Sequence, residues 1–277
     1  MKIPKELFAI LFKLHSSQPW LHRYEDQLIE LMNECADLQE QELIVNLLDK
    51  FCYLDSEKHA KSVERLCQKI AVDWHLDEGV TQIVACTADS NPDSGQQVGY
   101  EIRTGLGQIG WQAPFGVNRY DRAQRNIQER RHVVLVDEFV GTGQTMVGRV
   151  ETMRRQFEAK DVFDAKIYVI AYAGMEFALE NISRAGCEDV FFAHSLKKGI
   201  TELSPPDVVG EHLNLMGVIE SRLAAIWNGV NLPRLGYSGC EALYGRHLGN
   251  APNSVFPVFW WPILTNNVAR QTIFIRR

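Results

Sequence analysis

Paired cysteines, long apolar runs and excess positive charge are all missing from this sequence of 277 residues. Its six cysteines form no C-x-x-C pair, so a zinc ribbon or a disulfide scaffold is not expected, and a reducing, cytoplasmic setting fits better. No apolar run approaches the ~20 residues that span a bilayer. The short apolar stretch 7–12, which follows Lys2 and Lys5, has no small-residue cleavage site behind it, so neither a membrane span nor a signal peptide is predicted.

The charge balance excludes a further class of protein. The chain has 29 Lys and Arg against 35 Asp and Glu, which gives a formal net charge of −6. A general nucleic-acid coat would need net positive charge, and no direct signal for nucleic-acid binding is present. With 45% hydrophobic and 23% charged residues, the composition is that of a soluble globular protein with one large domain or two smaller ones.

Residues 1–76 read as a helical N-terminal region. Between residues 43 and 51, apolar side chains recur at the spacing of one helix face, and Ser56 is a plausible N-cap for a following helix. The block contains no motif that carries chemistry. We therefore interpret it as a packing module or as a surface that binds a protein partner.

Residues 77–228 show a different pattern, in which short β-branched runs alternate with helical stretches. Such alternation predicts an α/β fold with a mainly parallel sheet and helices on both faces. The predicted strands are 80–87, 132–136, 166–172 and 190–193, and the predicted helices are 96–106, 144–159, 176–184 and 207–227. Glycine and proline punctuate residues 229–277, which predicts an irregular C-terminal cap.

The most informative stretch is residues 133–145. Four apolar strand residues lead into Asp137 and Glu138, and a small-residue turn then opens the helix that begins near Gln144. In an open parallel sheet, ligands bind beyond the carboxyl ends of the strands, where these acids would lie. The turn consists of Gly141, Thr142, Gly143, Gln144 and Thr145, and it offers backbone N–H groups and two hydroxyls at a helix N-terminus, a suitable site for a phosphate.

Two carboxylates beside a phosphate site fit a sugar phosphate, whose hydroxyls face the acids while its phosphate faces the turn. A bound Mg²⁺ would reduce the remaining repulsion. A Walker A loop would need a Lys-Ser/Thr pair where Gln144 stands, and a dinucleotide fingerprint would need a small residue in place of Met146. The remaining alternative is a tight strand–helix turn with solvated acids.

Residues 133–145 resemble the phosphoribosyl-pyrophosphate motif of type I phosphoribosyltransferases, with four apolar residues, an acidic pair and a Thr-Gly-x-Thr loop. The resemblance implies that Asp137 and Glu138 hold the ribose hydroxyls and that the residues of the turn hold the 5-phosphate. It also implies Mg²⁺ on the ligand, near the acidic pair, and a motif acid that accepts a proton from the nucleobase. Glu138 departs from the more usual Asp, which leaves the identity of such a base open.

The same family places a pyrophosphate loop after the first core strand, which here corresponds to Ala88, Asp89 and Ser90. Ser94 is a candidate N-cap for the helix that follows. Asp89 is unexpected beside an anionic ligand, as is Asp93. Either these acids bind metal, or the loop is an ordinary turn.

A basic lid over the reacting centre is another expectation from the family. The segment 107–131 is rich in arginine, and Arg119 and Arg122 are the candidates for pyrophosphate binding. A solvated amphipathic helix over residues 121–131 explains the same pattern equally well.

Three further residues are candidates for contacting a nucleobase. Phe256 and Trp260 could offer a flat aromatic face, with core packing as the alternative, and His194 follows a predicted strand, with a structural role as the alternative. The aromatic C-terminal segment also resembles that of phosphoribosyltransferase-like proteins of bacterial conflict systems, including retron-associated effectors. That resemblance implies that the N-terminal helices dock onto a protein partner.

The sequence therefore predicts a phosphoribosyltransferase-like enzyme, a pentosyltransferase that binds phosphoribosyl pyrophosphate or a related nucleotide with Mg²⁺ and acts at the ribose C1 position. Two alternatives stay open: a non-catalytic nucleotide sensor, and a defence effector that acts on nucleotides and is restrained by a partner. The family often forms dimers, so a homo-oligomer is a further expectation from the resemblance.

Overall fold

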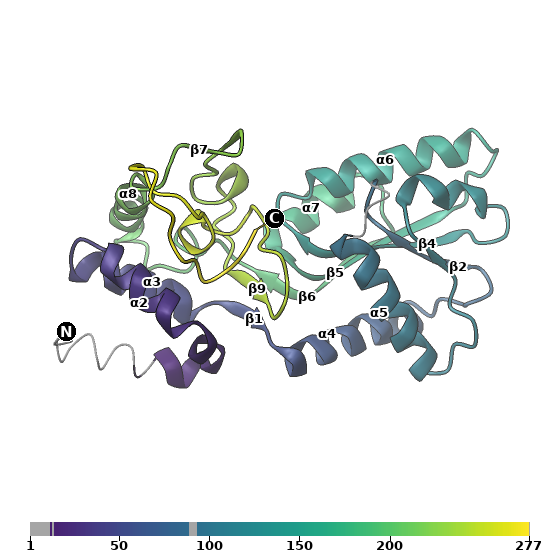
Figure 1. Cartoon of the computed structure of the whole chain (residues 1–277). Helices are drawn as coiled ribbons and strands as arrows, with labels where there is room; N and C mark the ends of the chain where they lie inside the picture. Colours follow the sequence, from purple (N-terminus) through teal and green to yellow (C-terminus); the bar gives the residue numbers. More distant parts are fainter. Residues whose placement is uncertain (1–11, 13, 89–92, 277) are drawn as a thin grey trace. The chain divides into compact units, whose positions relative to one another are not determined.

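The chain folds as two compact units, Ser56–Ser195 and the combination of Met1–Asp55 with Leu196–Arg277. They are called the α/β unit and the split unit below. The computed structural model describes residues 12, 14–88 and 93–276, and Figure 1 shows the elements along the chain. No helix in these described ranges combines the length and the apolar character needed to cross a bilayer.

A five-stranded sheet in the order β3-β2-β4-β5-β6 forms the centre of the α/β unit. Strand β2 runs parallel to β3 and β4, and β4 runs parallel to β5, with Asp137 opposite Ala171 in the register. This confirms the predicted α/β fold with a mainly parallel sheet. The strands are β2 (Thr81–Ala85), β3 (Gly116–Val117), β4 (His132–Val140), β5 (Lys166–Met175) and β6 (Asp189–Leu196).

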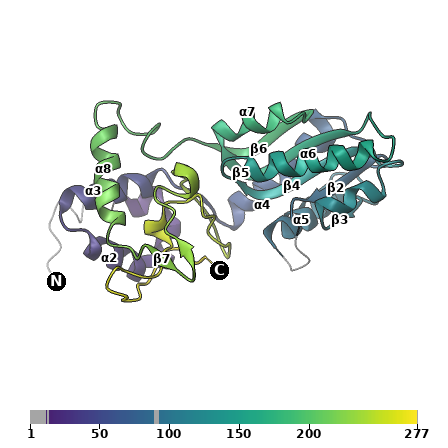
Figure 2. The same cartoon turned by 90° about the horizontal axis from the view of Figure 1, so that it is seen from above.

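Helices cover both faces of this sheet, with α6 and α7 on one face and α4 and α5 on the other (Figures 1 and 2). Alternate residues of β4 explain this, because Val133 and Leu135 join a core cluster with α6 residues such as Met146 and Val150. Val136 points to the other face, where a Cβ on Gly99 of α5 would lie 3.7 Å from it. The helical elements are α4 (Ser56–Gln68), η2 (Lys69–Asp73), α5 (Ser94–Gln108), η3 (Tyr120–Arg125), α6 (Gln144–Glu158) and α7 (Glu176–Arg184).

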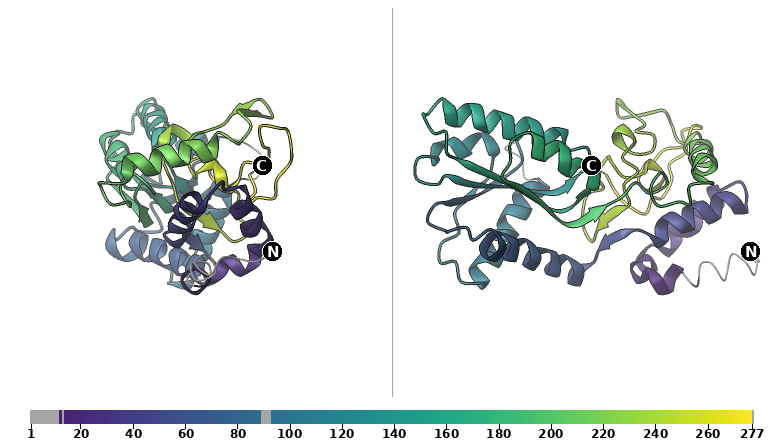
Figure 3. Two further views of the ribbon diagram at one scale, coloured as in Figure 1. Left: turned by 90° about the vertical axis from the view of Figure 1, so that its left-hand side faces the viewer. Right: turned by 180° about the vertical axis from the view of Figure 1, so that it is seen from behind.

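The split unit joins the N-terminal helices to the C-terminal region of the chain. Strand β1 pairs in parallel with β9, with Tyr53 opposite Gly245 (Figure 3), and the ring of Trp20 stacks on Tyr53 at 4.2 Å between centroids. Phe274 stacks on the same group of rings from the C-terminal end. The elements are η1 (Pro19–Tyr24), α2 (Glu25–Glu34), α3 (Leu38–Asp49), β1 (Cys52–Leu54), α8 (Val209–Glu220), β7 (Ile226–Trp227), β8 (Val230–Asn231), η4 (Tyr237–Gly239), β9 (Tyr244–Arg246) and η5 (Pro257–Phe259).

The boundaries of the two units differ from those of the predicted segments 1–76, 77–228 and 229–277. Helix α4 belongs to the α/β unit, whereas α8 belongs with the N-terminal helices and the C-terminal region in the split unit. Helical periodicity identifies the face that a helix buries and not the element that it is buried against, so the sequence pattern could not assign either helix to a unit.

Candidate functional site

Strand β4 continues through both predicted acids as far as Val140, beyond the end at residue 136 that the sequence pattern predicts. Its ladder to β5 pairs Asp137 with Ala171 and Phe139 with Ala173. Because successive side chains of a strand point to opposite faces, Asp137 lies on the α6 face and Glu138 on the α4 and α5 face. Glu138 is only 4% exposed. The two acidic side chains therefore lie on opposite faces of the sheet.

The environment of Asp137 raises the pKa of its carboxyl group toward neutral pH. Burial raises its pKa to about 7, and the nearby negative charges of Glu138 and Asp93 add to the rise. One carboxylate oxygen accepts the backbone N–H of Glu138 at 2.7 Å, and the thiol of Cys86 also hydrogen-bonds to this carboxylate. At neutral pH the group can thus take up or release a proton.

The predicted phosphate loop is a tight turn at the N-terminus of α6. Gly143 has φ +80°, and a Cβ there would lie 3.1 Å from Ile182 and 3.3 Å from Ala178, both on α7. Thr142 contributes its hydroxyl as acceptor for the N–H of Gln144 at 3.3 Å, and its carbonyl accepts from Asn181 at 3.4 Å. The N-cap residue Gly143 has no side chain to cap α6, and Gln144 and Thr145 in the first turn of the helix are exposed. Gly141 is half-buried in the same turn.

The loop after β2 is described only in part. Ala88 is exposed directly after the strand, while Asp89 and Ser90 lie outside the described residues. Asp93, and not the predicted Ser94, caps α5, with its side chain accepting the N–H of Gln96 at 3.0 Å, because Ser94 is already helical. A Cβ on Gly95 would lie 3.4 Å from the Oδ1 of Asp93 and 3.7 Å from the carbonyl of Val136, so Asp93 lies close to the strand that carries Asp137.

The arginine-rich segment lies beside the end of β2, where the carbonyl of Thr87 accepts the N–H of Tyr120 at 3.2 Å. Here the chain forms the short 3-10 helix η3 and not a longer amphipathic helix. Arg119 makes two 2.9 Å hydrogen bonds to the carboxylate of Asp121, and Arg122 lies 3.6 Å from the same group. Much of the positive charge that was predicted to face pyrophosphate is therefore compensated within the segment.

Arg149 is a basic residue near Cys86 and Tyr120 that sequence reasoning missed. Its guanidinium lies over the ring of Tyr120 at 4.4 Å and donates to the Tyr120 hydroxyl at 3.1 Å. Its Nε is buried without a partner among the described residues, and its charge acts on the Cys86 thiol. The signal was present in the sequence, because Arg149 follows Thr145 by four positions and so lies one helical turn along α6.

The three nucleobase candidates lie in different surroundings. Phe256 and Trp260 are 0% and 2% exposed in the split unit, and the indole of Trp260 donates to the carbonyl of Val255 at 2.9 Å. Burial favours the core-packing alternative for Phe256, whereas Trp260 also lines a cavity of this unit. His194, on β6, lies 2.9 Å from the hydroxyl of Ser62 on α4, and burial lowers its pKa.

The acids of the α/β unit suit a magnesium ion that arrives with its ligand. Within the described ranges no three or more His, Cys, Asp or Glu residues gather as a metal cage. Magnesium is commonly held by one or two carboxylates together with substrate phosphates. Asp93 and Asp137, of which Asp93 raises the pKa of Asp137, fit that mode of binding.

A parallel sheet with an acidic strand end and a glycine turn at a helix N-terminus defines the class of phosphoribosyltransferase-like proteins. A family model described as PRTase-CE matches residues 29–276, so the chain belongs to the PRTase-CE family. The match extends over both units, and so the N-terminal helices from α2 onward and the C-terminal region are part of the family's shared architecture.

Solved structures with a similar fold share little sequence with this chain. An orotate phosphoribosyltransferase from Aeropyrum pernix is 15% identical, with a TM-score of 0.33, over 57% of this chain and 78% of its own. A xanthine-guanine-hypoxanthine phosphoribosyltransferase from Helicobacter pylori is 10% identical, with a TM-score of 0.32, over 52% and 86%. A phosphoribosyltransferase from Corynebacterium diphtheriae is 15% identical, with a TM-score of 0.29, over 50% and 78%. A search of curated proteins found no match.

Proposed function

We propose that the α/β unit binds phosphoribosyl pyrophosphate or a related nucleotide together with Mg²⁺, and that it transfers or cleaves at the ribose C1 position. The observation that supports this most is the position of the phosphate loop. Residues 141–143 turn the chain from β4 into α6, whose N-cap Gly143 has no capping side chain, and Asp137 precedes that turn on the same strand. Helix N-termini of this kind bind phosphate groups.

In this proposal the 5-phosphate accepts hydrogen bonds from the backbone N–H groups of the turn and from the hydroxyl of Thr145. Asp137 faces the ribose and accepts a hydroxyl hydrogen bond. Arg149 lies one helical turn further along α6 and supplies positive charge near Cys86, whose thiol hydrogen-bonds to Asp137. Glu138 lies on the opposite face of the sheet, which gives it a supporting role in place of the direct ribose contact that the family resemblance implies.

The proposed reaction exchanges the group on C1. The bond from C1 to the pyrophosphate oxygen breaks, the leaving group keeps the electron pair, and an acceptor nitrogen or a water forms the new bond to C1. With a pKa of about 7, Asp137 can accept the proton that the acceptor releases. Asp93 and Asp137 would hold Mg²⁺, which would neutralise charge on the departing pyrophosphate when bound.

One feature of the site favours a second candidate, a sensor that binds the same ligand without turnover. The guanidinium of Arg119 is hydrogen-bonded to the carboxylate of Asp121, so Arg119 is not free to stabilise a leaving pyrophosphate. In a sensor, the ligand would change the surface that the N-terminal helices offer to a partner protein.

Isothermal titration of the full chain with phosphoribosyl pyrophosphate and Mg²⁺ tests the binding. Asp137→Asn and Thr145→Val should each weaken binding by about tenfold, since each removes a hydrogen bond to the ligand. Asp161→Asn is the matched control, because Asp161 is exposed, has φ +57°, which asparagine tolerates, and lies after α6.

Equal affinity in all four proteins would overturn the proposed site. If binding is lost as expected, pyrophosphate release with a panel of nucleobases separates the two candidates. Release supports the transferase, and tight binding without release supports the sensor.

A further inference from the structure

A cavity lies in the split unit, and none of its lining residues was assigned above to phosphate binding. Its volume is about 730 Å³, within the range of pockets that bind small molecules. The side chains that give it its character are Trp227, Arg234, Tyr237, Trp260, Trp261 and Arg276.

Aromatic rings make up much of the cavity wall. The ring centroid of Trp261 lies 5.8 Å from that of Trp227 and 5.4 Å from that of Trp260, both in edge-to-face geometry. Trp260 and Trp261 are buried and form the base, whereas Trp227 is half-buried and Tyr237 is exposed. Such a wall favours a planar aromatic group, which can pack against several rings at once.

The charged side chains that line the cavity are both positive. Arg276 lies over the ring of Trp260 at 5.5 Å and donates to the carbonyl of Ala251 at 2.7 Å, and burial lowers its pKa. Arg234 is exposed at the edge. None of the described residues that line the cavity has a carboxylate, although Glu220 is close enough to Arg234 to feel its charge. Two guanidinium groups without a lining acid favour an anionic ligand.

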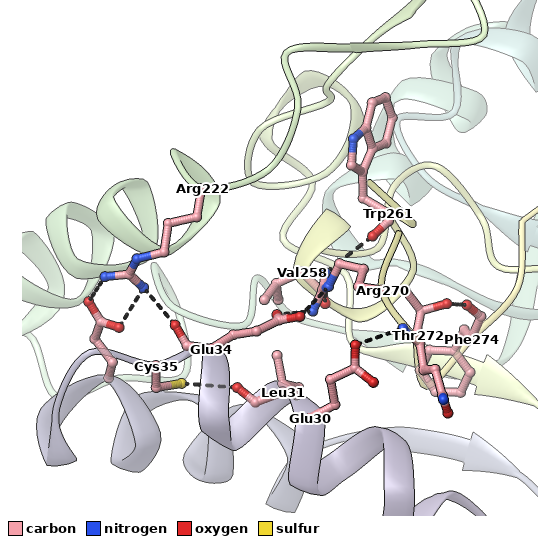
Figure 4. A network of polar contacts seen from close by, with 12 residues as sticks. Glu30, Leu31, Glu34, Cys35, Arg222, Val258, Trp261, Arg270, Thr272 and Phe274 are labelled. Carbon is pink, nitrogen blue, oxygen red and sulfur yellow. Dashed lines mark hydrogen bonds and ion pairs between the residues drawn. The ribbon is translucent and has the colours of Figure 1, made fainter. Parts of the chain in front are cut away.

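One donor at the base of the cavity has no acceptor. The indole nitrogen of Trp261 is buried and makes no hydrogen bond within the described part of the chain. Figure 4 shows the backbone carbonyl of Trp261 bonded to Arg270, with the indole ring pointing away from that polar network. A ligand that places an acceptor at this nitrogen would satisfy a group that is otherwise unpaired.

We propose that this cavity binds a small planar aromatic anion, at a site separate from the phosphate loop of the α/β unit. Nucleoside monophosphates and aromatic carboxylates share this chemistry. Adenosine 5′-monophosphate and 2-naphthoate are therefore the two probes, with adenosine as the control without charge and ribose 5-phosphate as the control without an aromatic ring.

Binding to the full chain is measured by calorimetry and by quenching of tryptophan fluorescence. At least one anionic probe should bind, and adenosine and ribose 5-phosphate should quench at least about tenfold more weakly. Binding of the monophosphate alone identifies the nucleotide class, and binding of the naphthoate alone identifies the carboxylate class.

Substitutions in the cavity locate the bound probe. Arg234→Gln and Trp227→Leu should each weaken binding by about fivefold to tenfold. The matched control is Arg23→Gln, an exposed arginine of the same unit that does not line the cavity. Because Arg234 and Trp227 are not fully buried, thermal melting should show that both variants are folded.

The proposal is overturned if neither anion binds at millimolar concentration, or if ribose 5-phosphate quenches as strongly as the monophosphate. It is also overturned if affinity is unchanged in both cavity variants. Monophosphate binding that is lost only in Thr145→Val belongs to the phosphate loop, and without naphthoate binding that result counts against the cavity.

Discussion

Gly143 is the residue on which the geometry of the phosphate loop depends. Its φ of +80° disfavours any other residue, and a Cβ would press against α7 at 3.1–3.3 Å. Gly143→Ala should therefore lower the free energy of unfolding by about 1–2 kcal/mol and weaken binding of phosphoribosyl pyrophosphate. Urea unfolding and calorimetry measure the two effects.

A glycine of the same helix provides the control for that substitution. Gly148 lies in the middle of α6, and a Cβ there would meet nothing within 4 Å. Gly148→Ala should stabilise the protein by up to about 1 kcal/mol, because alanine loses less conformational freedom in a helix. If both alanine variants shift stability in the same direction, the backbone of Gly143 does not have the role assigned to it.

Asp137 should make stability depend on pH. Its pKa rises from 3.8 in the ordinary carboxyl to about 7 in the folded protein, chiefly through burial. Between these values the folded protein keeps a proton that the unfolded chain has released, so the free energy of unfolding falls as pH rises and levels off above about pH 7. Asp137→Asn removes this effect, and its stability relative to the parent should improve by about 2–4 kcal/mol between about pH 4 and about pH 8.

The control for this pH effect lies in the split unit. Burial also raises the pKa of Glu220 to about 7, and both its oxygens accept the N–H of Leu235. Glu220→Gln should flatten the pH dependence of the split unit and leave binding of phosphoribosyl pyrophosphate unchanged. An Asp137→Asn variant with the same relative stability at both pH values would show that the carboxyl is not buried as described.

At the scale of residues, much of the candidate site could be predicted from neighbouring positions in the sequence. The acidic pair and the glycine turn occupy adjacent positions, so a strand, a turn and a helix suffice to place them. The position of Arg149 one helical turn after Thr145 can be read from the sequence, whereas its contact with Tyr120 from a distant segment cannot. The pairing of Arg119 with Asp121 is local in sequence, yet its geometry depends on the bend at η3.

At the scale of elements, a network of ion pairs ties α2 and α3 to the C-terminal region (Figure 4). Arg270 donates to the carboxylate of Glu34 at 2.8 Å and to the carbonyls of Val258 and Trp261. Nearby, Arg222 makes two hydrogen bonds to Glu40, at 2.6 and 2.7 Å. Together these contacts connect helices from one end of the sequence with loops from the other.

Arg270→Met should destabilise the split unit strongly, by about 3–5 kcal/mol. The substitution leaves a half-buried Glu34 without its partner and two buried carbonyls without a donor, and burial already raises the pKa of Glu34. Urea unfolding of the full chain measures the loss.

Arg184→Met is the control for this network, since Arg184 pairs with Glu180 on the exposed surface of α7. It should change stability by no more than about 0.5 kcal/mol. Equal losses in the two variants would mean that burial of the network contributes nothing.

Most elements of the α/β unit could be predicted from the sequence because each has a local pattern. Helix α4 begins at Ser56, one residue before the start that an N-cap at Ser56 predicts, and the predicted and observed ranges of α6 nearly coincide. The end of β4 could not be placed, because Asp137 and Glu138 break the apolar run while the ladder to β5 continues to Val140. The predicted helix 207–227 ends at Glu220, where the chain turns toward short strands that a single sequence hardly marks.

At the scale of the whole molecule, the two units differ in how the chain builds them. The α/β unit is one continuous segment with its own core cluster, from Val84 to Phe192. The split unit depends on contacts between the two ends of the sequence, such as the pairing of β1 with β9. Domain boundaries drawn along the sequence could not show this, because each predicted segment was treated as continuous.

This difference predicts which parts fold alone. Residues 56–196, which include all of β6, should unfold cooperatively in urea when expressed alone, because their core and both helix layers are complete. Residues 1–55 should not, since Trp20 and Phe51 lose the ring of Phe274 and β1 loses its partner. Circular dichroism and urea titration of both segments test this, and adding residues 196–277 in trans should restore order in 1–55. A cooperative transition in 1–55 alone, or none in 56–196, would contradict the division of the chain into these two units.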